Sequence, residues 1–522
     1  MISGRPPIRV GTMLDPESRI DPEFRIDPEF RALPLDALAA AALDRARALG
    51  ASHADLRVER IVTQTISLRD GHVTGVADDT VVGLAVRVIV DGVWGFASHG
   101  ELTTSRAAAT AERAVEVART LAPVARERVE RADEPVHDAV WVSAYVLDPF
   151  TVPIGEKVGL LGEWSRRLLA SDGIDHVAAH VEQVRECKFY ADLAGTRTVQ
   201  QRVRVGPSVT ATAVDRAAGG FETMRTLAPP AGRGWEYVTG TGWDAEGELA
   251  ELPALLAEKV KAPSVVAGPY DLVIDPTNLW LTIHESVGHA TEYDRAIGYE
   301  AAYAGTSFAT PDQLGTLRYG SPLMHVTGDR TFPHGLATIG FDDDGVATQE
   351  WDLVREGTLA GYQLDRTFAP RLGLDRSNGC AFADSPHHVP IQRMANVSLQ
   401  PDPGRDTTLD ELIAGVERGI YVVGDKSWSI DMQRYNFQFT GQRFFAIEGG
   451  RLAGQLRDVA YQATTTDFWG SMDGIGGPST WQLGGAMNCG KAQPGQVAAV
   501  SHGCPAARFR GVNVLNTQEE GR

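Results

Sequence analysis

Hydrophobic and polar residues follow two different periodicities along the first half of the chain. Apolar residues recur with helical spacing in three segments: 36–49, 107–121 and 154–171. The first of these ends at Gly50, as expected for a helix C-cap. Strand-like patterns occupy three other segments: 55–68, 81–90 and 177–226. Helices packed on a sheet of such strands predict an α+β fold.

The pattern changes near residue 263. A helical segment, residues 245–261, ends just before this point, and the chain beyond it is rich in strands and glycine. With 522 residues, 43% of them hydrophobic, the chain exceeds what one hydrophobic core usually serves. We therefore expect two domains, an N-terminal α+β domain at residues 35–262 and a strand-rich C-terminal domain at residues 263–522.

A hexapeptide repeat precedes the first predicted helix. Residues 15–32 read Asp-Pro-Glu-Ser-Arg-Ile, Asp-Pro-Glu-Phe-Arg-Ile and Asp-Pro-Glu-Phe-Arg-Ala. The recurring proline forbids a continuous helix, and three such copies are too short for a solenoid. We expect residues 1–34 to be a flexible extension, with a docking arm as the alternative.

Composition limits the partners and the compartment. The chain has 49 Lys and Arg against 68 Asp and Glu, a net charge of −19, which disfavours direct binding to nucleic acid or to an anionic membrane. No run approaches the ~20 apolar residues of a transmembrane helix, and the first 14 residues lack the apolar core of a signal peptide. The four cysteines are widely spaced, so we expect a reducing, cytoplasmic location.

The clearest chemistry lies in His284-Glu285-Ser286-Val287-Gly288-His289. Two histidines and a glutamate supply two zinc ligands and a general base. The spacing is unusual, because side chains five residues apart point about 140° apart on a regular helix. Both histidines reach one ion only if the turn widens to i→i+5 or the helix ends there, and Gly288 permits either. We expect this helix to begin at Pro276, after the N-cap Asp275.

A zinc site of this kind needs a third protein ligand and an open position for water. Cys489 is the first candidate, because small residues flank it and Lys491 favours a thiolate. Glu292, three residues after His289, competes as the third ligand. We instead expect Glu292 and Asp294 to support the ligands or to contact substrate.

Further motifs accompany these residues: Gly92-Val93-Trp94-Gly95-Phe96-Ala97-Ser98, Gly268-Pro269-Tyr270, Asp275-Pro276, Arg393-Met394-Ala395-Asn396 and Asn488-Cys489-Gly490-Lys491. With His284-Glu285-x-x-Gly288-His289-x-x-Glu292-x-Asp294 they resemble the signature of the TldD/PmbA family, the gyrase-modulator metalloproteases, and specifically its catalytic TldD branch. The resemblance extends from about residue 36 to the end of the chain.

The resemblance implies that His284, His289 and Cys489 hold a zinc ion and that Glu285 is the general base. It implies a peptidase that cleaves small or unfolded peptides in an enclosed cavity, with residues 263–522 as the catalytic domain and the N-terminal domain helping to enclose the site. It also implies a dimer, formed with a second copy or with a PmbA-like paralogue that lacks the metal motif. Arg393, from one of the motifs, joins the residues expected to support the ligands or substrate. Two alternatives stay open: a non-catalytic or regulatory subunit of such a complex, and a zinc-dependent hydrolase of a non-peptide amide.

Three features carry no assigned role. The chain departs from the family pattern between Asp425 and Phe439, where paired glycines often precede a Thr-Gly-x-Phe segment, and the departure bears on substrate choice or partner pairing. The oxyanion donor is not identified; the candidates are His387, His388, His502, Tyr293 and Arg393. Asp342-Asp343-Asp344-Gly345 lacks the spacing of an EF-hand loop and predicts a solvated turn.

Overall fold

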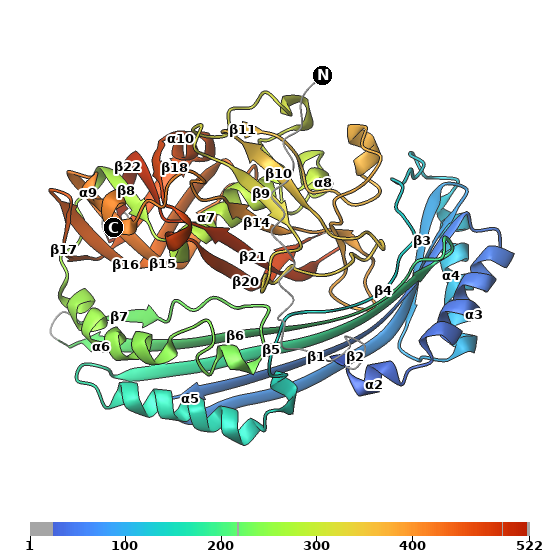
Figure 1. The fold of residues 1–522 in the computed structure, drawn as a ribbon, viewed down its shortest axis with the longest axis horizontal. Helices are drawn as coiled ribbons and strands as arrows, with labels where there is room; N and C mark the ends of the chain where they lie inside the picture. The colour runs from blue at the N-terminus through green and yellow to red at the C-terminus, as the bar shows by residue number, and fades with distance from the viewer. Residues whose placement is uncertain (1–24, 217–218, 493, 519–522) are drawn as a thin grey trace.

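The computed structural model describes residues 25–216, 219–492 and 494–518. The first half of the chain forms a long, curved sheet with helices on its outer side, and the second half lies over the inner side (Figure 1). Helices and mostly antiparallel strands are mixed in both halves, and the second half is strand-rich. The predicted α+β class is therefore confirmed. None of the helices in the described segments has the length and apolar character needed to cross a membrane.

Four long strands dominate the first half. The elements are α2 (Pro28–Arg31), α3 (Leu35–Ala48), β1 (His53–Arg69), β2 (His72–Val90), β3 (Val93–His99), α4 (Thr104–Leu121), β4 (Asp138–Val142), α5 (Ile154–Leu169), β5 (His176–Asp192), β6 (Arg197–Asp215), β7 (Gly220–Arg225) and α6 (Ala245–Lys261). The sheet order is β3-β2-β1-β5-β6-β4, with β7 also paired to β6. Asp70 and Gly71, both at positive φ, form the tight turn between β1 and β2, where Asp-Gly is a favoured pair.

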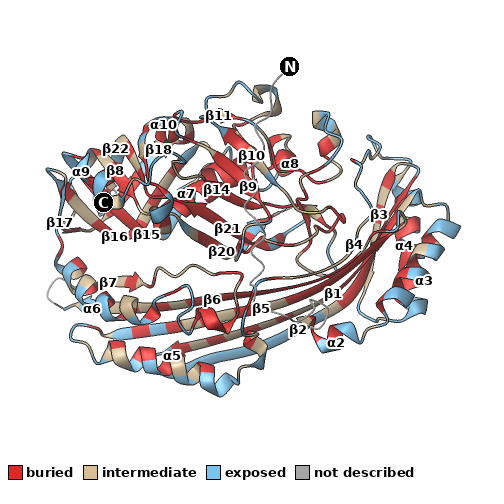
Figure 2. Ribbon diagram, in the orientation of Figure 1, coloured by how far each residue is buried: buried red, intermediate tan, exposed pale blue. Residues whose placement is uncertain are grey.

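The outer helices pack on this sheet through small and aliphatic side chains. Helices α3 and α4 share one buried cluster with β1 and β2 around Leu56 and Val86. Helices α5 and α6 share a second cluster around Trp164, at the other end of the sheet. The outward faces of these helices are largely exposed, whereas the strands beneath the second half of the chain are buried (Figure 2).

The second half contains many shorter strands. Its elements are β8 (Gly268–Ile274), α7 (Pro276–Ile283), α8 (Tyr293–Ala296), β9 (Val326–Asp329), β10 (Glu350–Arg355), β11 (Thr358–Leu359), β12 (Ala381–Phe382), β13 (Ile391–Gln392), β14 (Asn396–Leu399), α9 (Leu409–Ala414), β15 (Arg418–Ile430), β16 (Asn436–Glu448), β17 (Arg451–Leu456), β18 (Val459–Thr464), α10 (Thr465–Gly470), β19 (Met472–Ile475), β20 (Gln482–Lys491), β21 (Gln496–Cys504) and β22 (Ala507–Asn516).

A closed ring of strands supports the helix that carries the histidines. The main sheet runs β15-β8-β22-β18-β16-β17, and β16 also pairs with β15, so five strands close on themselves. Helix α7 packs against β15 of this ring and against the separate hairpin β20–β21. The strands before α6 belong to the long sheet, and the strands from β8 onward belong to other sheets. The predicted domain boundary at residues 262/263 stays a prediction.

The third copy of the hexapeptide repeat is part of the fold. Asp27 caps the short helix α2, and the side chains of Ile26 and Phe30 are buried in the cluster of α3 and α4. Asp27 also pairs with Arg185 of β5, with 3.0 Å between Oδ2 and Nη2. Residues 25–34 therefore belong to the folded part, which corrects the predicted extension of residues 1–34. The first copy of the repeat and most of the second lie outside the described residues.

Buried ion pairs join the two halves of the chain. They contradict the prediction of a solvated turn at residues 342–345. Asp342, Asp343 and Asp344 were expected in a solvated turn but are 1%, 5% and 3% exposed. Arg87 of β2 donates to Asp344 Oδ1 at 2.6 Å, and Lys188 of β5 donates to Asp343 Oδ2 at 2.8 Å. The acidic turn is therefore an ion-paired contact with the long sheet, because a buried carboxylate needs cationic or hydrogen-bond partners.

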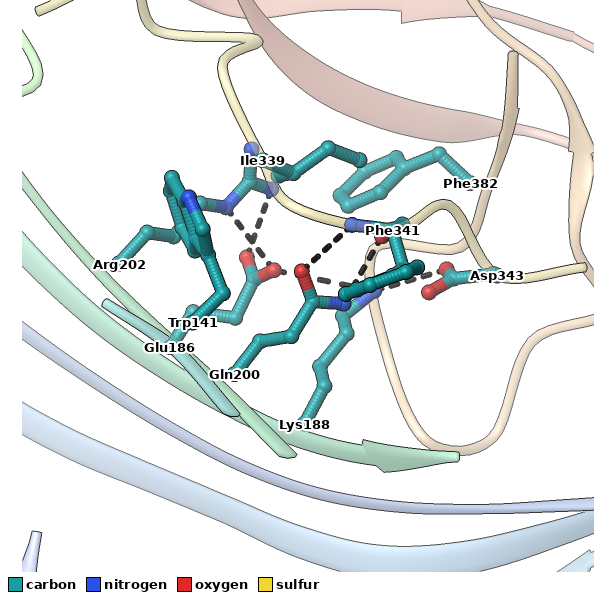
Figure 3. Close-up of a pocket in the computed structure, with 9 residues that line it drawn as sticks. All are labelled: Trp141, Glu186, Lys188, Gln200, Arg202, Ile339, Phe341, Asp343 and Phe382. Carbon is teal, nitrogen blue, oxygen red and sulfur yellow. Dashed lines mark hydrogen bonds and ion pairs between the residues drawn. The ribbon is translucent and has the colours of Figure 1, made fainter. Parts of the chain in front are cut away.

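The centre of this contact surrounds a cavity of about 10 Å³ (Figure 3). Lys188 and Gln200 extend from the long sheet toward the loop that carries Phe341 and Asp343. Gln200 Oε1 accepts from the backbone N–H of Phe341, at 2.8 Å, and its Nε2 donates to the Phe341 carbonyl. The two halves are thus held together by directional polar contacts as well as by packing.

Candidate metal centre

Helix α7 begins as its sequence predicts. The Asp275 side chain accepts the backbone N–H of Thr277 at 3.0 Å, and Pro276 occupies the first helical position. The apolar stripe Leu279, Ile283 and Val287 is fully buried. The end of this helix is therefore fixed in position by packing.

The helix widens where the two histidines occur. Residues His284–Gly288 form a π-helical turn, and the backbone N–H of His289 donates to the carbonyl of His284, five residues earlier. Of the two arrangements expected, a turn widened to i→i+5 or a helix end, the structure has the i→i+5 turn. Gly288, however, has φ −54° and ψ −60°, which any residue adopts. The glycine instead provides space, because a Cβ there would lie 2.6 Å from Met394 Sδ.

Side chains bond the carbonyls of this widened turn. Tyr319 donates its hydroxyl to the Ser286 carbonyl at 2.5 Å, and Gln363 Nε2 donates to the Gly288 carbonyl at 2.7 Å. Thr291 Oγ1 donates to the Val287 carbonyl at 2.9 Å. These bonds replace helical ones that the irregular end cannot make, so the surrounding fold stabilises the π turn.

The turn brings His284 and His289 together with Cys489 of β20. One ligand atom from each residue lies within 4.8 Å of the other two, and Cys489 Sγ is 3.7 Å from His289 Nε2. Ligand atoms of a tetrahedral zinc ion with two imidazoles and a thiolate are roughly 3.3–3.6 Å apart. All three side chains are buried. The donor set therefore fits zinc, and the distance between Cys489 Sγ and His289 Nε2 is close to that of a bound ion.

His502 of β21 determines which nitrogen of His284 is free. His502 Nδ1 lies 2.8 Å from the Val397 carbonyl, which only accepts, and its Nε2 lies 2.7 Å from His284 Nδ1. Burial, together with the neighbouring His284, lowers the pKa of His502 well below its usual value, so His502 is neutral. Its Nε2 then accepts from His284 Nδ1, and His284 Nε2 keeps a lone pair for a metal.

Glu292 determines in the same way which nitrogen of His289 is free. Its Oε2 accepts from His289 Nδ1 at 2.8 Å, which leaves His289 Nε2 facing Cys489. Burial alone would raise the pKa of Glu292, but Lys491 and His289 outweigh it and lower the pKa well below its usual value. Lys491 Nζ lies 3.2 Å from Glu292 Oε1 and 2.8 Å from Asp294 Oδ1. Asp294 thus contacts Lys491 rather than a histidine.

Arg393 orients the strand that carries the cysteine. Its Nη2 donates to the Cys489 carbonyl at 2.6 Å, and its Nη1 donates to the Gln496 carbonyl at 3.0 Å. Burial by itself raises the pKa of the Cys489 thiol, yet the interactions with His289 and with the positive charge of Arg393 outweigh it. The pKa of Cys489 therefore lies below its usual value, which favours the thiolate.

The candidate ligands line a cavity of about 610 Å³ between the two halves. The first half contributes residues 206–208, Arg225 and residues 227–230, and the second contributes the end of α7, the hairpin β15–β16 and strand β20. Glu285 lies in this lining beside His284, and its Oε2 is 3.1 Å from Nη1 of Arg434. Sequence analysis missed Arg434, which no motif marks. The departure from the family pattern at residues 425–439 falls on this wall, which includes Asp425, Lys426 and Trp428.

Models of two domains from one protein family match this chain. The PmbA/TldA metallopeptidase C-terminal domain matches residues 267–516, and PmbA/TldA metallopeptidase domain 1 matches residues 54–118. The chain belongs to the TldD/PmbA family of metallopeptidases. The longer match contains both histidines, Glu285 and Cys489, so the candidate metal centre lies in the part of the chain that the family shares.

Relatives and solved structures match over most of the chain. A metalloprotease of Methanothermobacter thermautotrophicus is 27% identical, covering 89% of this chain and 96% of the relative, and a zinc metalloprotease TldD homologue of Saccharolobus solfataricus is 23% identical, covering 90% and 98%. A proposed modulator of DNA gyrase from Thermotoga maritima has a TM-score of 0.70 at 16% identity, covering 90% and 99%. TldE of Thermococcus kodakarensis has a TM-score of 0.65 at 15% identity, covering 90% and 98%. The family and the named relatives indicate a metalloprotease, and the structures share its fold.

Proposed function

We propose that the chain is a zinc-dependent peptidase that hydrolyses small or unfolded peptides inside the cavity between its halves. The observation that carries the proposal is the convergence of His284, His289 and Cys489 within 4.8 Å, with Glu285 beside them in the cavity wall. This donor set leaves a zinc ion one open position, as in catalytic sites with three protein ligands.

Each residue has a distinct task in this reaction. His284, His289 and Cys489 hold the zinc, which when bound polarises the scissile carbonyl and activates water. Glu285 takes the proton from the attacking water and returns it to the leaving amine. His502 and Glu292 fix the tautomers of the two histidines, and Arg393 orients the strand of Cys489.

The cavity supports peptides as the substrate class. A volume of about 610 Å³ lies within the range of roughly 300–1,000 Å³ that is typical of small-molecule sites. Because both halves line it, a folded protein cannot bring a peptide bond to Glu285 without local unfolding. Extended segments and short peptides satisfy this restriction.

The assembly and the location rest on more limited support. The likeness to TldE supports a dimer with a PmbA-like paralogue, or with a second copy, as part of the proposal. A cytoplasmic location stays a prediction; the four cysteines are free and buried, which is compatible with a reducing compartment.

The test compares bound zinc and peptide cleavage in three proteins: wild type, Glu285→Gln and Cys489→Ala. We expect wild type to hold one zinc ion per chain and to cleave an unfolded peptide. Glu285→Gln should keep the zinc and lose turnover, because the amide accepts no proton. Cys489→Ala should lose most of the zinc at limiting metal concentration, because only two protein ligands remain.

Each protein is assayed with and without a co-expressed paralogue. Wild type that holds zinc but cleaves no unfolded peptide in either preparation would defeat the peptidase proposal and leave the regulatory subunit or the amide hydrolase. Stoichiometric zinc in Cys489→Ala would remove Cys489 as a ligand. Asp473→Asn serves as the control, because Asp473 pairs with Arg508 and Arg510 at the surface, away from the cavity.

A further inference from the structure

Arg434 is a buried cation placed directly against the proposed general base. It lies at the tip of the hairpin between β15 and β16, 149 residues from Glu285, and its Nη1 is 3.1 Å from Glu285 Oε2. Its side chain is 15% exposed and lines the same cavity as His284 and Cys489. A guanidinium beside the reacting groups, in a poorly solvated site, interacts strongly with charge that develops there.

The backbone holds Arg434 in an uncommon conformation. Its φ is 63°, in the left-handed region, which is strained for a non-glycine residue. The Arg434 N–H donates to the Asp431 carbonyl at 3.1 Å, and Thr465 Oγ1 donates to the Arg434 carbonyl at 2.8 Å. The carbonyl of Met432, on the same turn, accepts the N–H of Thr306 at 2.8 Å. Hydrogen bonds from two other segments thus hold the turn in place. Backbone strain that the surrounding structure maintains in this way is common at functional sites.

The guanidinium also has unused donors. Its Nε is buried without a hydrogen-bond partner, and its Nη2 makes only a long contact, 3.4 Å, with the Ala304 carbonyl. A buried donor without a partner destabilises the protein, and a ligand that accepts from it would recover that free energy. The free protein therefore has donor capacity left beside Glu285.

The other Arg and Lys side chains that line the cavity are ion-paired or exposed to solvent. Within the described residues, the Arg and Lys side chains that line the cavity are Arg225, Lys426 and Arg434. Arg225 makes two bonds of 2.8 Å to Asp425, and Lys426 is exposed to solvent. Of these three described side chains, only Arg434 combines burial, spare donors and contact with Glu285.

The oxyanion donors proposed from the sequence lie elsewhere. His502 is engaged by His284 and the Val397 carbonyl, and Arg393 by two backbone carbonyls. Tyr293, His387 and His388 are not among the described residues that line the cavity. These five residues are therefore not placed to supply the donor.

We infer that Arg434 is a catalytic residue that stabilises the oxyanion of the peptide-hydrolysis step; the inference rests on the proposed function. Water oxygen bonds to the scissile carbonyl carbon, a water proton passes to Glu285, and the carbonyl π electrons move to oxygen. An electron pair on that oxygen then re-forms the C=O bond as the C–N bond breaks, the C–N electron pair stays on nitrogen, and nitrogen takes the proton from Glu285. Arg434 donates to the oxygen while that oxygen is negative.

Because the negative charge moves during the step, one arginine can interact with both Glu285 and the substrate oxygen. In the free protein, Glu285 carries the negative charge that Arg434 neutralises. When Glu285 accepts the proton, this charge appears on the substrate oxygen instead. A guanidinium has five donors in a fixed plane, so it can keep one bond to Glu285 and offer another to the oxygen. The cation thus remains paired throughout the step.

The experiment measures kcat, KM, zinc content and phosphonate inhibition for wild type, Arg434→Met and Arg434→Lys. The phosphonate is a peptide analogue whose tetrahedral anion mimics the oxyanion. We expect Arg434→Met to lower kcat about 10²–10³-fold, the usual effect of losing one oxyanion donor, with KM changed less than about threefold. Phosphonate inhibition should weaken by a similar factor. Arg434→Lys keeps the positive charge but lacks the planar guanidinium, so its kcat and its phosphonate inhibition should fall less.

Two controls separate catalysis from folding. Zinc content should match wild type in both variants, because Arg434 bonds Glu285 and not a proposed ligand, and both variants should remain folded at the assay temperature. Arg405→Met removes an arginine paired with Glu411 at the surface and should leave kcat unchanged.

Other outcomes overturn the inference. Arg434→Met with kcat within about threefold of wild type, or with raised KM and unchanged kcat, would do so, and so would undiminished phosphonate inhibition. If Arg434→Met unfolds or loses zinc, Arg434→Lys decides: wild-type kcat and wild-type phosphonate inhibition in that variant would refute the role. A wild type that cleaves no peptide overturns the proposed function first, and this inference with it.

Discussion

Glu292→Gln is the sharpest test of how the fold prepares the metal centre. In the wild type, Glu292 Oε2 accepts from His289 Nδ1 at 2.8 Å, and Oε1 accepts from Lys491 Nζ at 3.2 Å. Glutamine has the same shape but only one acceptor oxygen. If that oxygen faces His289, the amide NH₂ confronts the Lys491 ammonium, donor against donor; if it faces Lys491, His289 loses its acceptor.

Both arrangements weaken His289 as a ligand. Loss of such a carboxylate partner typically costs 10–100-fold in metal affinity, or about 1.4–2.7 kcal/mol. We therefore expect the zinc Kd of Glu292→Gln to rise by this factor. The fold should persist, because Lys491 keeps Asp294 at 2.8 Å and Arg295 keeps Glu300 at 3.0 Å.

Zinc affinity is measured by competition with a chelator of known Kd at pH 7.5. Asp294→Asn is the matched control: it removes a carboxylate from the same lysine but touches no histidine, so its zinc Kd should stay within about threefold of wild type. Unfolding in excess zinc checks that both variants are folded. Wild-type affinity in Glu292→Gln would refute the reasoning. An equal loss of zinc affinity in Asp294→Asn would show that the affinity depends on the total charge near the site and not on the hydrogen bond to His289.

Two further predictions concern stability. Burial raises the pKa of Glu59 to about 7 despite Lys188, so the native protein binds more protons than the unfolded chain between pH 4.5 and about 7. The free energy of unfolding should fall across that window by up to about 3 kcal/mol. Glu59→Gln should flatten this fall in chemical denaturation at pH 5 and 7.5, and an unchanged slope would contradict the assignment. In Gly95→Ala, the new Cβ would lie 2.0 Å from the Ala114 carbonyl oxygen, so we expect a loss of about 1–3 kcal/mol and a lower Tm. Gly75→Ala, which meets no atom within 4 Å, is the control, and equal Tm values would count against the reasoning.

Local signals in the sequence were sufficient for much of the fold around the site. Asp275 and Pro276 predicted where α7 begins, because a cap and a first-turn proline act within a few residues. The spacing of His284 and His289 predicted the widened turn, because a regular helix cannot place both side chains on one ion. The reason for Gly288 was misjudged, since its need for space depends on Met394, far along the chain.

Contacts between distant segments could not be predicted. The burial of Asp343 and Asp344 depends on Lys188 and Arg87, which lie more than 150 residues away and reach the turn only after the long sheet forms. Arg434 is separated from Glu285 by 149 residues, and its position depends on a turn with no motif. Cys489 was the first candidate because small residues flank it and Lys491 follows, but its approach to His289, 200 residues away, depends on where strand β20 lies.

The ion-paired contact between the halves affects which substrates the cavity admits. Separating the halves would leave the charges of Asp343, Asp344, Lys188 and Arg87 without their partners, and exposing or stranding such charges is costly. Hinge opening, the usual way for a two-part enzyme to admit a large substrate, is therefore disfavoured. We expect the entrance to behave as an aperture of fixed width, which selects polypeptides by how thin and extended they are more than by their sequence.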